Sequence, residues 1–134
     1  MITRGLRNNN PFNIRKSKSR WLGKIKGDDK DFETFDCLEH GYRAGLILLA
    51  NYYKKYKLHS YRTILQRFAP ITENNLANYE YYIFANCRIK PDAFISLNTL
   101  LWHIAPLIAK YESGITDVDL IHEVTINICK TYHV

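Results

Sequence analysis

The sequence has no apolar stretch long enough to cross a membrane. The longest apolar run extends only from Ala44 to Ala50, whereas a membrane-spanning helix needs about 20 such residues. The first residues, from Met1 to Asn8, also lack the apolar core of a secretory signal. These absences predict a protein that is made in the cytoplasm without a signal peptide and that does not insert into a membrane.

Cysteine is scarce as well. The chain contains three cysteines, Cys37, Cys87 and Cys129, and they form no CxxC pair. This excludes a disulfide scaffold and a zinc finger, and we interpret the three as reduced, mostly buried thiols. The five histidines form no HxH or HxxxH pair. The sequence therefore predicts no dedicated metal site, and we expect no cofactor.

The chain is instead rich in hydrophobic residues, tyrosine and positive charge. Its 134 residues are 46% hydrophobic, include ten tyrosines and carry a formal charge of +6, which suits one globular domain over residues 1–134. The lysines and arginines gather in residues 4–30 and 54–67. This favours an anionic or sugar-like partner. Nucleic acid is the weaker alternative, because the sequence shows no helix-turn-helix, RNP-like or zinc-knuckle pattern.

The N-terminal third predicts a turn and a small β-hairpin. Asn8 to Pro11 has the chemistry of a turn. Residues 21–26 and 32–35 are typical of two short strands, joined by a turn at Gly27 to Lys30.

The remainder predicts helices. Their expected ranges are about 36–57, 60–69, 74–87, 97–113 and 116–132. Asp36 with Glu39, and Thr116 with Asp119, match capping boxes. Pro70 is expected to stop the second helix, and Pro106 to kink the fourth helix or begin its second half. The fold class is mainly α (α+β), a helical domain with a small β-hairpin near its N-terminus.

Glu112 is the first candidate for a catalytic residue. It stands in Glu112-Ser113-Gly114 at the end of an apolar helix, where Gly114 lets the chain turn away. A carboxyl group packed at such a place can stay protonated and act as a general acid, as the cleavage of a glycosidic bond requires. The alternative is an exposed glutamate near a helix end, although a carboxylate there is mildly unfavourable with the helix dipole.

Other side chains are candidates for the same chemistry. Glu39 is the alternative acid, with the capping box as its structural interpretation, and Glu73 lies just before a helix, where a carboxylate is favoured in any case. Amides and aromatic faces suit sugar hydroxyls and rings. The candidates of this kind, each of which also fits a core or turn position, are Asn9, Asn10, Asn13, Trp21, Tyr79 and Tyr82.

The segment from Arg4 to Arg15 resembles the opening of a family of small phage and prophage proteins, whose usual form is RGIRNNNPGNIR. Phe12 replaces the usual glycine of that motif. The resemblance covers nearly the whole chain, and the family's Glu-x-Gly at a helix end matches Glu112 to Gly114. It continues through residues 21–23, 32–35, 41–44, 67–70 and 73–74, and Tyr79. These proteins are described as virion structural proteins or as lysozyme-like cell-wall proteins.

A more distant resemblance is to bacterial N-acetylglucosaminidases and lytic transglycosylases. The former carry an Asn-Leu-Phe-Gly-Ile-Lys segment before a hairpin, similar to Asn10 to Arg15, and the latter hold their catalytic acid in a Glu-Ser-Gly at a helix end. Both have a helical tyrosine near the cleft, in a segment similar to Glu73 to Tyr79. In those enzymes the glutamate helix comes first, so the resemblance implies a circularly permuted lysozyme-like domain.

This resemblance implies a monomer that cleaves peptidoglycan glycan strands, at the cell wall or in a virion if it is delivered there. Glu112 would be a single general acid, Tyr79 would orient it or the intermediate, and Asn10, Asn13 and Trp21 would line the cleft. A non-catalytic virion or peptidoglycan-binding protein of the same fold is the first alternative. A nucleic-acid-binding accessory protein is the second.

Overall fold

A computed structural model describes residues 2–68 and 73–134. The protein is mainly helical and has a small two-stranded antiparallel hairpin. The elements, in chain order, are α1 (Arg4–Arg7), β1 (Lys24–Ile25), β2 (Thr34–Phe35), α2 (Leu38–Lys55), α3 (Tyr61–Phe68), α4 (Glu73–Cys87), α5 (Leu97–Thr99), the π-helix η1 (Leu100–Ile104), α6 (Ala105–Ser113) and α7 (Val118–Tyr132). Within the described residues, no helix has both the length and the apolar character that crossing a membrane demands.

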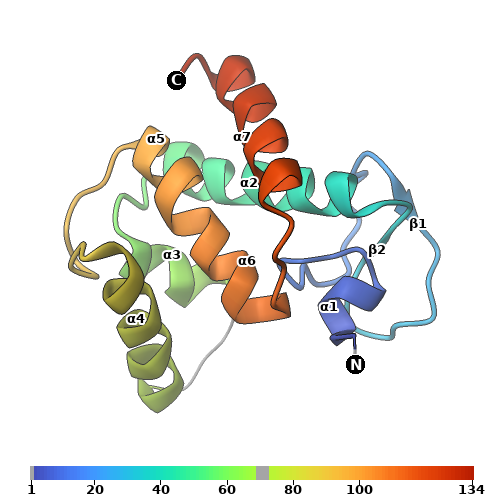
Figure 1. Cartoon of the computed structure of the whole chain (residues 1–134), viewed down its shortest axis with the longest axis horizontal. Coiled ribbons are helices and arrows are strands. Elements are labelled where there is room, and N and C mark those ends of the chain that lie inside the picture. Colours follow the sequence, from blue (N-terminus) through green and yellow to red (C-terminus); the bar gives the residue numbers. More distant parts are fainter. Residues whose placement is uncertain (1, 69–72) are drawn as a thin grey trace.

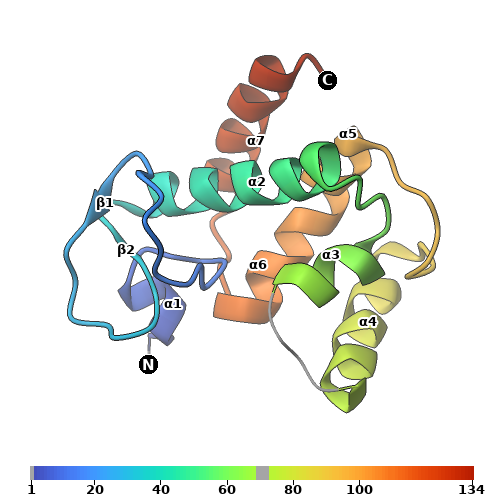
Figure 2. The ribbon, with the colours of Figure 1, turned by 180° about the vertical axis from the view of Figure 1, so that it is seen from behind.

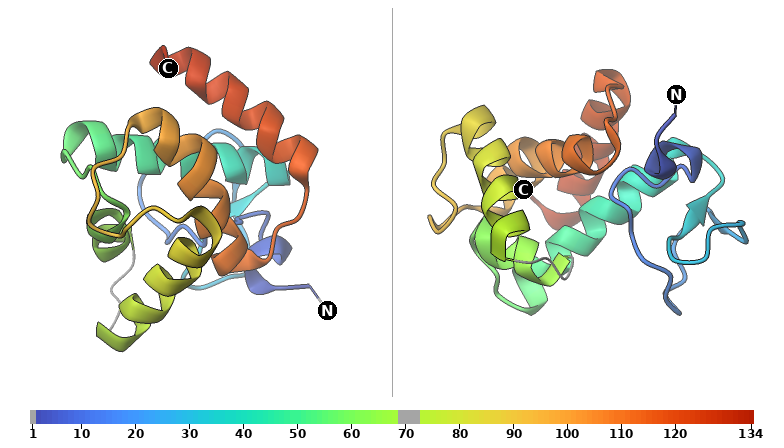
Figure 3. Two further views of the ribbon diagram at one scale, coloured as in Figure 1. Left: turned by 60° about the vertical axis from the view of Figure 1, so that its left-hand side comes forward. Right: turned by 90° about the horizontal axis from the view of Figure 1, so that it is seen from below.

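Helix α2 connects the two ends of the molecule. It runs between α1 with the hairpin at one end and α3 with α4 at the other (Figures 1 and 3). Helices α6 and α7 pack across it, and Figure 2 shows the same arrangement from behind. Leu46 and Leu49 of α2 are completely buried, as are Ile104 before α6 and Ile108 within it. Burial of this apolar face is the main force that holds the helices together.

The hairpin is shorter than the sequence predicts, with two residues in each strand. Lys24 lies opposite Phe35 and Ile25 opposite Thr34. The second strand, β2, also forms a backbone hydrogen bond with the Asn-rich loop. The Phe35 N–H donates to the carbonyl of Asn8 over 2.9 Å. Pairing with this loop replaces the longer ladder that an alternating pattern suggests.

Neither predicted capping box forms. Cys37 rather than Asp36 is the N-cap of α2, and the Asp36 carboxylate turns to His40 instead. Asp117 rather than Thr116 caps α7, and its carboxylate accepts from the Leu120 N–H over 3.1 Å. Each N-cap lies one residue later than predicted, so Glu39 and Asp119 stand at the second helical position and not at the third, which a capping box requires.

The predicted fourth helix is divided into three pieces, α5, η1 and α6. Pro106 lies in the first turn of α6, where its missing N–H costs no helical hydrogen bond. The five-residue π-helix Leu100–Ile104 directly precedes it. The prediction that Pro106 begins the second half of this helix is therefore confirmed. The predicted stop at Pro70 lies outside the described residues.

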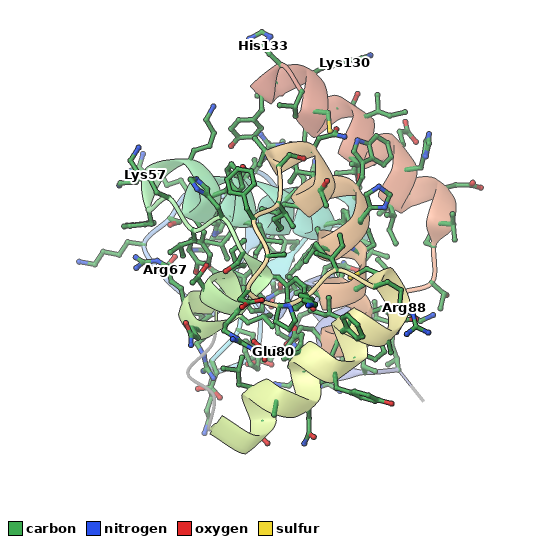
Figure 4. All side chains as sticks on the ribbon, turned by 90° about the vertical axis from the view of Figure 1, so that its left-hand side faces the viewer. Lys57, Arg67, Glu80, Arg88, Lys130 and His133 are labelled. Atoms are coloured by element: carbon green, nitrogen blue, oxygen red, sulfur yellow. The ribbon has the colours of Figure 1, made fainter. Side chains whose placement is uncertain are left out.

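An ion pair joins α3 to α4. The Arg62 guanidinium donates to both carboxylate oxygens of Glu80, over 2.7 and 3.0 Å. Figure 4 shows Glu80 on the side of α4 that faces α3. Arg paired to a carboxylate through two bonds fixes orientation as well as distance, and this contact sets the position of α4, which carries Tyr79.

We expect the stability of the protein to decrease below about pH 4, in part through Asp29. The Arg4 guanidinium, the amide of Asn8 and the N–H of Asp31 all donate to its carboxylate and hold the Asp29 pKa well below its usual value of about 3.9. A lowered folded-state pKa gives stability that is present above the unfolded pKa and is lost as the pH falls. Thermal unfolding between pH 2.5 and 6 should show a shallower pH dependence for Asp29→Asn. The same change at its exposed neighbour, Asp28→Asn, should leave the dependence unchanged, and an unaltered slope in Asp29→Asn would contradict this expectation.

Candidate functional site

Glu112 lies in the last turn of α6, and the end of this helix is firmly fixed. Gly114 adopts a left-handed conformation with a φ of 75°, and its N–H donates to the carbonyl of Lys110 over 2.8 Å. The Ser113 hydroxyl donates to the carbonyl of Ala109, also over 2.8 Å. Ser113 is buried, whereas Glu112 is half-buried. The backbone that carries the Glu112 side chain is therefore fixed, and solvent reaches part of this residue.

Two neutral donors from distant segments meet this carboxyl group. The hydroxyl of Tyr79, in α4, donates to Oε2 over 2.7 Å. The side-chain amide of Asn13 donates to Oε1 and to the Glu112 backbone carbonyl, each over 3.1 Å. These residues are 33 and 99 positions away from Glu112 in the chain. The structure thus brings together the two residues predicted to be catalytic and one of those predicted to bind substrate.

Tyr79 is a permanent hydrogen-bond donor at this site. Its side chain is buried, with 3% of the residue exposed. Burial, followed by the charge of Glu112, raises the pKa of the Tyr79 hydroxyl far above its usual value of about 10. The hydroxyl keeps its proton at any physiological pH, so it can orient the carboxyl group but cannot act as a base.

Tyr79 belongs to a small group of aromatic rings beside Glu112. The Tyr79 ring stacks on that of Tyr111, with 3.9 Å between the ring centroids. The ring centroid of Tyr82 lies 5.3 Å from that of Tyr111. Tyr111 remains 43% exposed and precedes Glu112 directly. An exposed aromatic face beside a carboxyl group can stack on a sugar ring. Tyr111 is absent from the residues predicted to form the site, and its position next to Glu112 in the sequence is the signal that could have found it.

The position of Asn13 depends on a close approach between α1 and the end of α6. Asn13 has a φ of 51°, a left-handed conformation that asparagine tolerates. Gly5 lies against it, because a Cβ on Gly5 would be 2.9 Å from Asn13 Oδ1 and 3.0 Å from Ser113 Cβ. The Thr3 hydroxyl donates to the Ser113 carbonyl over 2.7 Å. Asn13 Oδ1 is buried and accepts from no described residue.

The side chains of two further candidates, Asn9 and Asn10, form hydrogen bonds with the protein backbone. Asn10 is completely buried, and its amide bonds to the backbone of Ile14 and to the carbonyl of Glu33. Such an amide cannot touch a bound sugar, so the expectation that Asn10 lines a cleft is wrong. Asn9 is half-buried and donates to the carbonyl of Phe35.

The remaining candidates lie in other surroundings. Trp21 lines a cavity of about 550 Å³ beside β1, among basic residues of the segment from Lys16 to Gly27. Glu39 is exposed and lines a different cavity of about 300 Å³ between α2 and α7. Glu73 begins α4, and its side chain lies outside the described part of the protein. Glu112 is thus the candidate acid with Tyr79 and Asn13 as partners.

Comparison with known proteins finds a phage homologue. The chain is 43% identical over 84 residues to Protein P5 of Pseudoalteromonas phage PM2. The match covers 60% of this chain and 52% of that protein, so the chain spans about half the length of the curated relative that it matches. No protein-family model matches the chain. The association with phage that the sequence predicts is therefore supported.

Proposed function

We propose that this protein cleaves the glycan strands of peptidoglycan, with Glu112 as the general acid. The observation that carries the proposal is the carboxyl group of Glu112, fixed at a helix end by Tyr79 and Asn13 and open to solvent on one side. Glycoside cleavage needs one carboxyl group that is held still and protonates the leaving oxygen. A half-buried surface carboxylate without such donors would not point to this chemistry.

The two donors favour the transfer of the proton. When a glycan covers Glu112 it excludes water, so the hydrogen bonds from the two donors act in a medium of low dielectric constant. As the proton moves to the glycosidic oxygen, negative charge develops on the carboxyl group. The bonds from the Tyr79 hydroxyl and the Asn13 amide then strengthen, so these groups stabilise the transition state more than the ground state.

A single carboxylate can complete the reaction if the substrate supplies the nucleophile. A hydroxyl of the same sugar attacks C1 as the bond to the leaving oxygen breaks, or the acetamido oxygen attacks first and forms an oxazolinium ion, whose C1–O bond breaks when the hydroxyl attacks C1. For the hydroxyl, the Glu112 carboxylate takes up the proton that the attacking group loses and is restored. This is the course of a lytic transglycosylase, and its product is an anhydro sugar rather than a reducing end.

The packing of α1 on α6 supports a lysozyme-like fold with permuted order. Thr3 bonds to Ser113 at the end of the glutamate helix, so a chain that ran from α6 directly into α1 would have the element order of the enzymes that the sequence resembles. The ends of the present chain lie far apart in the ribbon, because α7 follows α6 and leads away from this junction (Figure 1). The junction for a permutation would be residues 3 and 113 rather than the termini.

Purified cell walls provide the test. Incubation with the protein should release soluble muropeptides, and mass spectrometry of their ends separates anhydro products from reducing ones. The phage origin of the homologue fits a second candidate, a non-catalytic phage protein that binds peptidoglycan. That candidate predicts that the protein sediments with cell walls and releases no muropeptides.

Tyr79→Phe should lower the rate of muropeptide release by about 10- to 100-fold. The change removes one hydrogen bond to a carboxylate, which contributes about 1.5–3 kcal/mol, and each 1.4 kcal/mol is a factor of ten in rate. The stacked ring of Tyr79 is kept, so circular dichroism should match the wild type. Tyr81→Phe, at a 74% exposed position of the same helix, is the matched control. A wild-type rate of muropeptide release in Tyr79→Phe would show that this hydroxyl does not orient Glu112.

A further inference from the structure

Three side chains with metal-binding atoms meet where α2 begins. Asp36, Cys37 and His40 each offer one ligand atom, and these atoms lie within 4.8 Å of one another. The sequence predicts no dedicated metal site, because its histidines form no HxH or HxxxH pair. The turn into α2 supplies a different spacing, since His40 lies about one helical turn beyond Asp36 and Cys37 and points back toward them.

We propose that Asp36, Cys37 and His40 form a binding site for Zn²⁺. A thiolate, an imidazole and a carboxylate are ligands that Zn²⁺ accepts together. The hard cations Mg²⁺ and Ca²⁺ prefer oxygen alone, so the thiol and the imidazole argue against them. Three protein ligands leave the fourth tetrahedral position to water or to an external ligand. This site is separate from Glu112 and does not depend on the proposed glycan cleavage.

A glycine provides the space in which these donor atoms meet. Gly23 has a φ of 80°, and its carbonyl accepts from the Asp36 N–H over 2.8 Å. A Cβ on Gly23 would overlap His40 Nδ1 and would lie 2.6 Å from Asp36 Oδ1. Any other residue at position 23 would therefore occupy the place where the imidazole and the carboxylate converge. The absence of a side chain at Gly23 thus lets two of the three ligand atoms meet.

The side chain of the third ligand, Cys37, lies against Asp36 and does not cap the helix. Cys37 is the N-cap of α2, yet its side chain makes no capping hydrogen bond. Of the three cysteines, which the sequence predicts to be mostly buried, Cys129 is buried while Cys37 and Cys87 are half-buried. The His40 and Asp36 side chains are 29% and 50% exposed, so an ion from solvent reaches the site.

The charges of the site balance those of the ion. The start of a helix carries a partial positive charge, which opposes a lone cation but favours a thiolate and a carboxylate. The ionised Asp36 and Cys37 together neutralise Zn²⁺. The Nδ1–H of His40 donates to Asp36 Oδ1 over 2.6 Å when no metal is bound. Binding releases the thiol proton to solvent and moves the imidazole proton from Nδ1 to Nε2, which leaves the Nδ1 lone pair for the metal.

Titration of the reduced protein with Co²⁺, a spectroscopic substitute for Zn²⁺, tests the ligand set. We expect one equivalent to bind and to give a near-ultraviolet charge-transfer band from the Cys37 thiolate. Cys37→Ser should abolish this band. His40→Gln should weaken binding at least about tenfold, since even partners outside the coordination shell change metal affinity 10- to 100-fold. Cys87→Ser, at another half-buried cysteine, is the matched control and should bind as the wild type does.

Alkylation of the wild-type protein gives a second measurement that no folding defect can disturb. Zn²⁺ should slow the alkylation of Cys37 at least about tenfold and leave that of Cys87 unchanged, because a coordinated thiolate is a poor nucleophile. Peptide mass spectrometry measures both sites in one sample. Equal alkylation of Cys37 with and without Zn²⁺, or a Co²⁺ spectrum unaffected by Cys37→Ser, would overturn the proposal.

Discussion

Glu112→Gln is expected to lower the rate of muropeptide release from purified cell walls by about 10²- to 10⁴-fold, the usual contribution of a general acid. Glutamine has the same shape as glutamate but cannot protonate a glycosidic oxygen. The Tyr79 hydroxyl can still donate to the amide oxygen, and the Asn13 amide can still donate to the Glu112 backbone carbonyl. The fold should therefore persist while the chemistry is lost.

Two controls make this result specific. Glu123→Gln makes the same substitution at an exposed glutamate of α7, and this variant should retain the wild-type rate. Sedimentation of Glu112→Gln with cell walls should be unchanged, because the acid acts on the reaction rather than on the affinity. Release at the wild-type rate in Glu112→Gln would disprove the role of this residue, and Glu39→Gln would then be the next variant to measure.

Gly41→Ala is expected to destabilise the protein by about 2–3 kcal/mol, although the same change inside an ordinary helix stabilises it by about 1 kcal/mol. Gly41 lies in α2 and is buried. A Cβ there would overlap the backbone carbonyl oxygen of Asn9, and it would lie 2.8 Å from the Asn9 carbonyl carbon and 3.1 Å from Pro11 Cδ. Backbone atoms of a packed loop cannot move aside as the end of a flexible side chain can. Urea unfolding followed by circular dichroism measures the loss.

The same variant should also impair the site. The loop from Asn9 to Asn13 must shift to accommodate the methyl group, and Asn13 then loses its position at Glu112. A misplacement of about 1 Å can lower a rate about 10²-fold. Asn51→Ala, at an exposed position of α2, is the matched control, with a gain of a few tenths of a kcal/mol and an unchanged rate. A Gly41→Ala protein more stable than the wild type would show that the loop does not pack on α2 as described.

The helices are the part of the fold that the sequence predicts well. Apolar residues recur at helical spacing from Leu38 to the end of α2, and α7 shows the same pattern. Periodicity is a local property, so it defines which face of a helix is buried whatever that face packs against. The helix starts are less well predicted, as Asp36 and Thr116 show. A capping box is lost when the helix starts a single residue later, and the apolar periodicity does not define the helix start to one residue.

The candidate site was predicted in part. The Glu-Ser-Gly at a helix end singled out Glu112. Side-chain chemistry made Tyr79 and Asn13 candidates, and resemblance to known enzymes gave them their expected roles. The neighbouring Asn10 has the same chemistry in the sequence as Asn13, yet Asn10 is completely buried and Asn13 contacts Glu112. Loop conformation makes this difference, because the left-handed backbone at Asn13 turns its amide toward α6, while the Asn10 amide donates to the carbonyls of Ile14 and Glu33.

The sequence by itself determined the helical class, the short hairpin and a carboxyl group at the end of an apolar helix. Tertiary structure alone decided which groups meet that carboxyl group. The physical reason is range. Propensity, periodicity and turn chemistry act over a few residues, whereas Asn13 and Glu112 are 99 residues apart and meet only because Gly5 and Gly41 let α1 and its loop pack directly on α6 and α2.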